Sequence, residues 1–168
     1  MPTNLEIKAR IDSIQRSEQI ATSHGAVFSG ILNQTDTYFE VLRGRLKLRE
    51  ITLNAAELIF YNRSELTSKR MSEFQIFSVS DANTLKEILL KVLPLRGVVK
   101  KQRRLYMYGT SRIHLDVVEG LGCFLEFEVP IKSTQEEAIK VCNLLIDAFE
   151  IQKENFIKES YIDLILAS

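Results

Sequence analysis

The sequence contains little that would stabilise the protein by covalent cross-links or anchor it in a membrane. Its 168 residues include two cysteines, three prolines and no tryptophan. Cys123 and Cys142 lie far apart and outside any CxxC or Cys/His spacing, so neither a disulfide framework nor structural zinc is expected. No apolar run is long enough for a membrane span, and the first residues lack the order of a signal peptide. We therefore expect a cytoplasmic protein with reduced cysteines and no membrane partner.

The chain also lacks an excess of charge of either sign. Its 22 lysines and arginines balance 22 aspartates and glutamates, which gives a formal net charge of +0. No global field would then draw the protein to nucleic acid, and no nucleic-acid partner is expected. The length and a hydrophobic fraction of 45% fit one globular domain over residues 1–168. Any electrostatic chemistry must arise from local segregation of charges.

Hydrophobic periodicity predicts many strands and a few helices. We expect strands over residues 4–11, 35–41, 44–51, 56–63, 71–79, 97–108, 111–120 and 123–130. We expect helices over residues 12–24, 81–93, 133–149 and 159–167. This order is typical of an α+β protein in which antiparallel strands predominate.

Charged residues gather on one face of several predicted strands. Side chains two residues apart share a face of a strand, so Arg45, Lys47 and Arg49 form a basic row. By the same rule Glu126 and Glu128 form an acidic pair on another strand. Like charges at neighbouring positions are unfavourable unless an opposite charge lies between them.

Two interpretations of this segregation are open from the pattern alone. The charged faces could meet water on an ordinary half-buried antiparallel sheet. They could instead line an enclosed site, where arginine and lysine bind the oxygens of a polyphosphate. Carboxylates in such a site would serve as oxygen ligands for Mg²⁺ or Mn²⁺.

The series of motifs favours the second interpretation. "NLEIKAR" at residues 4–10 is followed by "QTDTYF", "GRLKLRE", "AELIFYNR", "VVKKQRRLY", "RIHLDVVEGLGCFLEFE" and the terminal "SYIDLIL". This ordered series resembles the CYTH domain of the triphosphate tunnel metalloenzymes, in its class IV adenylyl cyclase-like branch, and it covers residues 4–166. The first motif is a variant of the family's ExExK signature, because Asn4 occupies the place of the first acid.

The resemblance implies a fold and a set of site residues. The expected fold is a closed eight-stranded antiparallel barrel, with polar side chains inside and helices packed outside. Expected ligands for Mg²⁺ or Mn²⁺ are Asn4, Glu6, Glu126 and Glu128. Expected triphosphate contacts are Lys8, Arg45, Lys47, Arg49, Arg63, Lys101, Arg103 and Arg112. Lys8, Arg112 and Asp116 are the expected catalytic residues, and Asp116 would orient a basic residue or hold a second metal.

Three functions remain open at this point. The leading hypothesis is conversion of ATP to cyclic AMP and pyrophosphate. The second is hydrolysis of inorganic triphosphate, thiamine triphosphate or a nucleoside triphosphate. The third is a non-catalytic module that binds nucleotide or polyphosphate, which Asn4 makes plausible. The resemblance also implies that the chain could form a homodimer.

Several other residues carry expectations of their own. Arg70 is expected outside the site or at its rim. His114 is expected to be a hydrogen-bonded structural residue, with a place in the tunnel lining as the alternative. Tyr38 and Tyr61 are expected to pack, and Lys158 is a candidate for capping the tunnel, as a C-terminal lysine does in the family.

Overall fold

The computed structural model of the chain describes residues 1–53, 55–66 and 69–168. Its strands are β1 (Thr3–Arg10), β2 (Val27–Phe39), β3 (Arg45–Ile51), β4 (Ala55–Leu66), β5 (Lys69–Ser78), β6 (Leu95–Tyr108), β7 (Ser111–Val118) and β8 (Gly122–Pro130). Its helices are α1 (Ile14–Ser23), α2 (Ala82–Val92), α3 (Gln135–Ala148) and α4 (Tyr161–Ala167), with a 3-10 turn, η1 (Lys153–Asn155), before α4.

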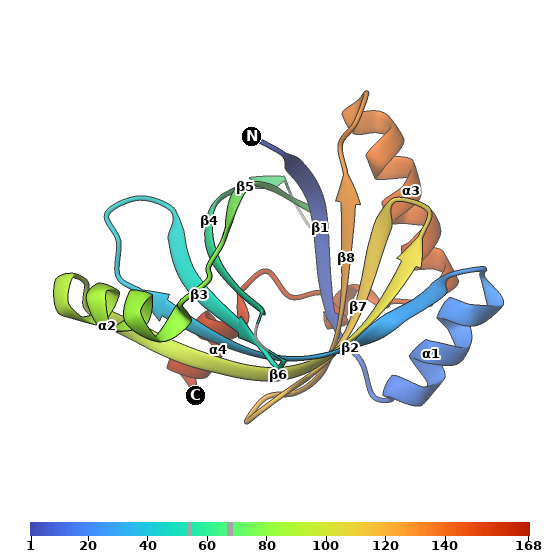
Figure 1. Cartoon of the computed structure of the whole chain (residues 1–168). Coiled ribbons are helices and arrows are strands. Elements are labelled where there is room, and N and C mark those ends of the chain that lie inside the picture. Colours follow the sequence, from blue (N-terminus) through green and yellow to red (C-terminus); the bar gives the residue numbers. More distant parts are fainter. Residues whose placement is uncertain (54, 67–68) are drawn as a thin grey trace.

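The strands close into an antiparallel barrel in the order β1-β5-β4-β3-β2-β6-β7-β8 (Figure 1). Strand β1 completes the circle by pairing with β5 on one side and with β8 on the other. The expectation of a closed eight-stranded barrel with external helices is thereby confirmed.

The predicted elements are present, with one clear difference at β2. This strand begins at Val27, whereas alternation predicted a start at residue 35. Its first half pairs with the end of β6, where Val27 lies opposite Met107, and a bulge interrupts the register between Phe28 and Gly30. Because the bulge breaks the period of two, and because the partner strand is distant in sequence, local alternation could not reveal this segment.

Both faces of the barrel wall are buried, for different reasons. In β1 the residues from Asn4 to Ala9 are all buried, although Glu6 and Lys8 alternate with Leu5 and Ile7. Leu5 and Ile7 belong to the apolar core outside the barrel, whereas Glu6 and Lys8 line its interior. The charged faces therefore do not meet bulk water, which excludes the open half-buried sheet.

Helices α1 and α3 cover the outside of the barrel near β1, β7 and β8 (Figure 1). The core beneath them includes Ile113, Phe127 and Leu145. Their N-termini are capped by the side chains of Ser13 and Thr134, which accept hydrogen bonds from backbone N–H groups one turn later.

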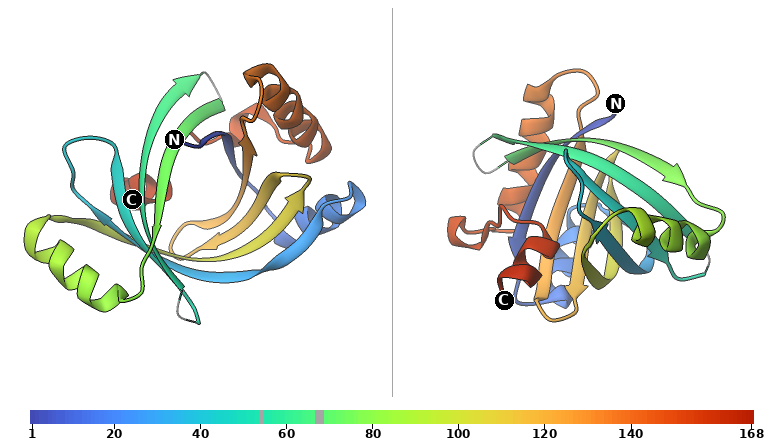
Figure 2. Two further views of the ribbon diagram at one scale, coloured as in Figure 1. Left: turned by 45° about the horizontal axis from the view of Figure 1, so that its top comes forward. Right: turned by 90° about the vertical axis from the view of Figure 1, so that its left-hand side faces the viewer.

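Helix α4 packs closely across β6 at Gly97. A Cβ atom there would lie only 2.6 Å from Cδ1 of Ile162, so a larger residue would force the Ile162 side chain to shift. Figure 2 shows α4 against the barrel, whereas α2, which contacts β3, projects away from it. In the described part of the chain, no helix has the length and apolar character needed to cross a membrane.

Candidate functional site

The barrel encloses a cavity of about 310 Å³ that both predicted groups of charged residues line. Among the described residues, its basic side chains are Lys8, Lys47, Arg49, Arg63, Lys101, Arg103 and Arg112. Its acidic side chains are Glu6, Glu57, Glu126 and Glu128, and Asn4 and His114 also line it. The surplus of basic groups suits a polyanionic ligand.

A larger groove of about 690 Å³ runs along β2 and β6 next to this cavity and shares Gln34, Ile51 and Lys101 with it. Exposed side chains such as Asn33, Lys100 and Glu119 border it, and it lacks a concentrated charge of either sign. We assign the functional site to the interior cavity because buried charged groups of complementary chemistry converge there.

One wall of the cavity is acidic and is built from three adjacent strands. The register places Glu6 of β1 opposite Glu128 of β8, and His114 of β7 opposite Glu126 of β8. Ligand atoms of His114, Glu126 and Glu128 all lie within 4.8 Å of one another. Lys8 also belongs to this wall, with Nζ 3.3 Å from Oε2 of Glu126.

The acids on this wall have different electrostatic states. Burial and then repulsion from Glu126 raise the pKa of Glu6 to about 7. Burial alone would also raise the pKa of Glu126, but Lys8, a hydrogen bond with His114 and Arg103 together hold it well below its usual range. Burial among other cations lowers the pKa of Lys8 to about 8.

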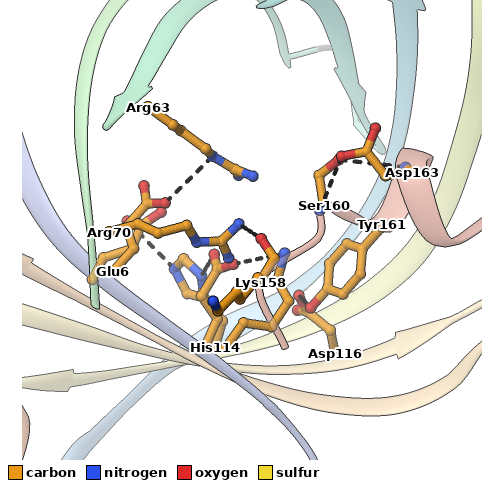
Figure 3. A network of polar contacts seen from close by, with 12 residues as sticks. Glu6, Arg63, Arg70, His114, Asp116, Lys158, Ser160, Tyr161 and Asp163 are labelled. Atoms are coloured by element: carbon orange, nitrogen blue, oxygen red, sulfur yellow. Dashed lines mark hydrogen bonds and ion pairs between the residues drawn. The ribbon is translucent and has the colours of Figure 1, made fainter. Parts of the chain in front are cut away.

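Several buried polar atoms in the cavity lack partners. Among the described residues, no hydrogen bond reaches Oε2 of Glu6, Oε1 of Gln34, the hydroxyl of Tyr61 or Nε of Arg63. Figure 3 shows Arg63 pointing toward Glu6, but the Nε–Oε2 distance of 3.8 Å is too long for a hydrogen bond. Unpaired buried polar atoms are costly, so a charged ligand would satisfy them. The oxygen-rich donors around Glu6 fit Mg²⁺ or Mn²⁺.

The opposite wall is basic, and the carboxylate of Asp36 binds three of its cations. This carboxylate is fully buried and accepts two hydrogen bonds of 2.8 Å from Arg49. Lys101 and Lys47 lie 2.9 and 3.3 Å from its Oδ2 atom. Burial would raise the pKa of Asp36, but these three cations hold it well below its usual range. Burial lowers the pKa of Lys101 to about 7 despite the attraction of Asp36.

Sequence reasoning missed Asp36. The spacing could have indicated it, because Asp36 is two residues from Gln34 and from Tyr38 in the motif "QTDTYF" and so shares their strand face, which points inward. Its role depends on the pairing of β2 with β3, which places it opposite Arg49. Glu57 was missed for a similar reason, because it also lies opposite Arg49 but on β4.

Asp116 occupies a similar supporting position behind Arg103. It is fully buried and accepts two hydrogen bonds of 2.8 Å from the Arg103 guanidinium. A third hydrogen bond of 2.8 Å comes from the hydroxyl of Tyr161 in α4. Because Asp116 does not line the cavity, its position suits orientation of Arg103, one of the two roles expected for it.

The structure departs from expectation at Arg45. Its guanidinium binds the carboxylate of Asp163 at 2.7 and 3.1 Å and the hydroxyl of Ser160 at 2.9 Å. Arg96 donates to the same carboxylate at 3.1 Å. Arg45 does not line the cavity, because α4 supplies its counter-charge at the end of the barrel. Arg45 thereby anchors α4, and its expected triphosphate contact stays a prediction that this position does not support.

Tyr38 and Tyr61 pack in a buried cluster, as expected, whereas Arg70 is more buried than expected. Arg70 is buried inside the end of the barrel and donates to the backbone carbonyl of Lys158 (Figure 3). Tyr38 and Tyr61 line the cavity, and Nζ of Lys47 lies 5.5 and 5.4 Å from their ring centres. The side chain of Lys158 borders a separate pocket at the barrel end.

A closed barrel with opposed acidic and basic inner walls defines a tunnel protein built to hold a polyanion beside a cation. The family comparison agrees with this class. The model of the CYTH domain matches residues 2–161, and the chain belongs to the CYTH domain family. The resemblance inferred from the motifs is thereby confirmed.

Related proteins cover nearly the whole chain. A Methanocaldococcus jannaschii protein named "Putative adenylate cyclase MJ0240" is 26% identical over 171 residues, covering 95% of this chain and 97% of that protein. The solved PH1012 protein of Pyrococcus horikoshii superposes with a TM-score of 0.87 at 26% identity, covering 96% of this chain and 98% of that one. HpAC1 from Hippeastrum, described as having a dominant triphosphatase activity, has a TM-score of 0.69 at 14% identity, covering 98% and 95%. This last likeness concerns the fold alone.

Proposed function

We propose that this protein is a metal-dependent enzyme acting on the triphosphate of a nucleotide, and that its reaction is the conversion of ATP to cyclic AMP and pyrophosphate. The observation that carries the proposal is the enclosed cavity in which a basic wall faces an acidic wall. Basic side chains alone would explain the binding of any polyanion, with or without a metal ion. The acidic wall requires a cation to lie between it and the phosphates.

The basic side chains would hold the triphosphate. Arg49 and Arg103 are each fixed by two hydrogen bonds to a buried aspartate, so their orientation exists before the substrate arrives. Such preorganisation favours stabilisation of charge as it develops during phosphoryl chemistry. Lys47, Lys101 and Arg63 would add further contacts, and Arg112 reaches the cavity from a more exposed position.

The acidic wall would hold Mg²⁺ or Mn²⁺ through Glu6, Glu126 and Glu128, with Asn4 as a neutral oxygen donor. The ion would neutralise phosphate oxygens and make the attacking hydroxyl more acidic. Lys8 lies between this wall and Tyr161, with Nζ 4.0 Å from the ring centre, and this position supports a contact with a phosphate beside the acids.

In the proposed reaction the ribose 3′ oxygen attacks the α-phosphorus. The bond from this phosphorus to the oxygen bridging to the β-phosphate breaks, pyrophosphate leaves and the hydroxyl proton passes to water. Arg103 and Arg49 would retain the leaving pyrophosphate through the guanidinium N–H groups that do not bind Asp116 and Asp36. Asp116 acts through Arg103 in this scheme and is a positioning residue.

An apolar strip inside the cavity supports a nucleotide over inorganic triphosphate. Ile59, Phe74 and Ile76 line the cavity together with the basic residues. These apolar side chains could pack against the organic part of a substrate. Inorganic triphosphate has no organic part. Hydrolysis is the second candidate, because the same basic wall would serve attack of water on the terminal phosphorus. The homodimer and the single-domain organisation stay predictions.

The test is product analysis with purified protein. ATP, tripolyphosphate and thiamine triphosphate are incubated with Mg²⁺ or Mn²⁺, and the products are separated by ion-exchange chromatography. We expect cyclic AMP and pyrophosphate from ATP. Release of orthophosphate would favour hydrolysis, and tight binding without turnover would leave the non-catalytic module.

A double variant tests the site itself. Glu126→Gln with Glu128→Gln should abolish metal-dependent turnover, whereas Glu119→Gln outside the cavity should not. Full metal-dependent activity in the double variant would show that the metal binds elsewhere.

A further inference from the structure

His114 is fully buried at the acidic wall, yet it meets carboxylates at both ring nitrogens. Its Nδ1 atom lies 3.3 Å from Oε1 of Glu126, within hydrogen-bond distance. Its Nε2 atom lies 3.9 Å from Oε2 of Glu128, which is beyond that distance. The two contacts are therefore different in kind.

The first contact determines the tautomer of the ring. Glu126 is ionised, since Lys8 and Arg103 lie 3.3 and 3.8 Å from its oxygens, and an ionised carboxylate only accepts hydrogen bonds. The Nδ1 atom must then carry the proton. In a neutral ring, Nε2 presents a lone pair toward the Glu128 carboxylate, and two electron-rich atoms face each other across 3.9 Å.

A bound cation between Nε2 of His114 and Glu128 would relieve this contact, and it would also neutralise a neighbouring acid. Glu6 lies opposite Glu128 on the adjacent strand and is 7% exposed. Its Oε2 atom has no hydrogen-bond partner among the described residues. Strands β7, β8 and β1 thus bring one imidazole and two carboxylates to one wall.

We propose that Nε2 of His114 is a direct metal ligand beside Glu128, with Glu6 as the next acid on the same wall, and that Glu126 mainly orients the ring. A carboxylate that holds Nδ1–H while Nε2 binds the metal is a recurrent arrangement in proteins. Imidazole favours first-row transition metals, whereas Mg²⁺ prefers oxygen ligands only. The site therefore selects Mn²⁺ over Mg²⁺. This inference rests on the proposed metal-dependent function.

The test measures the metal, with no need for turnover. Untagged protein is titrated with Mn²⁺, free Mn²⁺ is quantified by electron paramagnetic resonance, and Mg²⁺ is added in competition. Electron spin echo envelope modulation then reports whether a nitrogen-14 nucleus is bound to the ion. We expect nitrogen coupling in the wild type and in Glu126→Gln.

His114→Gln should lose the nitrogen coupling and bind Mn²⁺ at least about tenfold more weakly. Its affinity for Mg²⁺ should change less, because glutamine offers an oxygen. The sequence contains two histidines, and the exposed His24 provides the matched control. His24→Gln should keep both the coupling and the affinity.

Bound Mn²⁺ without nitrogen coupling in the wild type would overturn the proposal while leaving a metal-dependent enzyme intact. Failure of both metals to bind would overturn the proposed function as well. If His114→Gln does not fold, the wild-type spectrum decides alone.

Discussion

The hydroxyl of Tyr161 donates a 2.8 Å hydrogen bond to Asp116, and this contact joins the C-terminal helix to the interior of the barrel. Asp116 in turn holds the guanidinium of Arg103 through two hydrogen bonds. Burial, and then the charge of Asp116, raise the pKa of the Tyr161 phenol well above its usual range, so the phenol remains a donor. A residue of α4 thereby supports one of the basic groups that line the cavity.

Asp116→Asn should destabilise the fold and misplace Arg103. Breaking a buried ion pair while leaving the other charge in place typically costs about 3–5 kcal/mol. Tyr161→Phe removes one hydrogen bond to a charged group and should cost roughly 1.5–3 kcal/mol. Chemical denaturation gives both free energies of unfolding, and calorimetry gives the affinity for tripolyphosphate. Unchanged stability and affinity in Asp116→Asn would contradict the positioning role.

Asp36→Asn should leave three basic side chains without their shared counter-charge. Arg49, Lys101 and Lys47 would then repel one another, and the free protein should unfold at a lower temperature. An anion that binds only the folded state restores stability by mass action. Tripolyphosphate should therefore raise the melting temperature of Asp36→Asn more than that of the wild type. An equal rise in both proteins would argue that the ligand does not reach these cations.

Glu6 should make the metal-free protein less stable as the pH rises from about 4.5 to about 7. Its pKa of about 7 in the fold lies above the usual 4.5, so the folded state binds more protons within this interval. Its contribution is then present below pH 4.5 and is lost as the pH rises through 7. The full loss is on the order of 3 kcal/mol.

The variant Glu6→Gln isolates this effect from other titrating groups. Relative to the wild type with EDTA, it should gain stability between pH 5 and pH 8, as measured by urea denaturation. Glu119→Gln, on an exposed turn, serves as the control. A constant difference across this interval would show that Glu6 titrates normally.

Asn4→Glu should restore the first acid of the ExExK signature at a cost in stability. Asn4 is buried and lines the cavity on the same strand face as Glu6. A carboxylate there should strengthen Mn²⁺ binding and, in the metal-free protein, add repulsion to the acidic wall. Titration with Mn²⁺ and thermal unfolding with EDTA measure the two effects. Unchanged affinity would indicate that residue 4 points away from the ion.

Much of the architecture was predictable from local sequence. The alternation of Glu6 and Lys8 with Leu5 and Ile7 predicted a strand with one charged face, whereas the closed barrel was implied by the resemblance of the ordered motifs to the CYTH domain. Helix α3 was predicted to begin at Ser133 or Thr134, with Glu136 and Glu137 in its first turn, and Thr134 is its N-cap. The charged strand face and the helix depend on residues within one element, where spacing alone determines which side chains share a face.

The partners of individual side chains were not predictable in this way. Arg45, Lys47 and Arg49 look equivalent along β3, yet Arg45 binds Asp163 and Arg49 binds Asp36. His114 meets Glu126 because β7 and β8 pair in one particular register. Such contacts arise from strand registers and from the docking of α4, both of which join distant parts of the chain.

By itself the sequence determined that charged and apolar side chains would occupy opposite faces of the strands, because the period of a strand is a local property. Only the tertiary structure decided which charges would meet, since closure of β1 onto β5 and β8 sets the registers that place acids beside acids and cations around Asp36. That closure also removes the charged faces from bulk water. An unpaired polar atom inside the barrel therefore costs free energy, which binding of a ligand would recover.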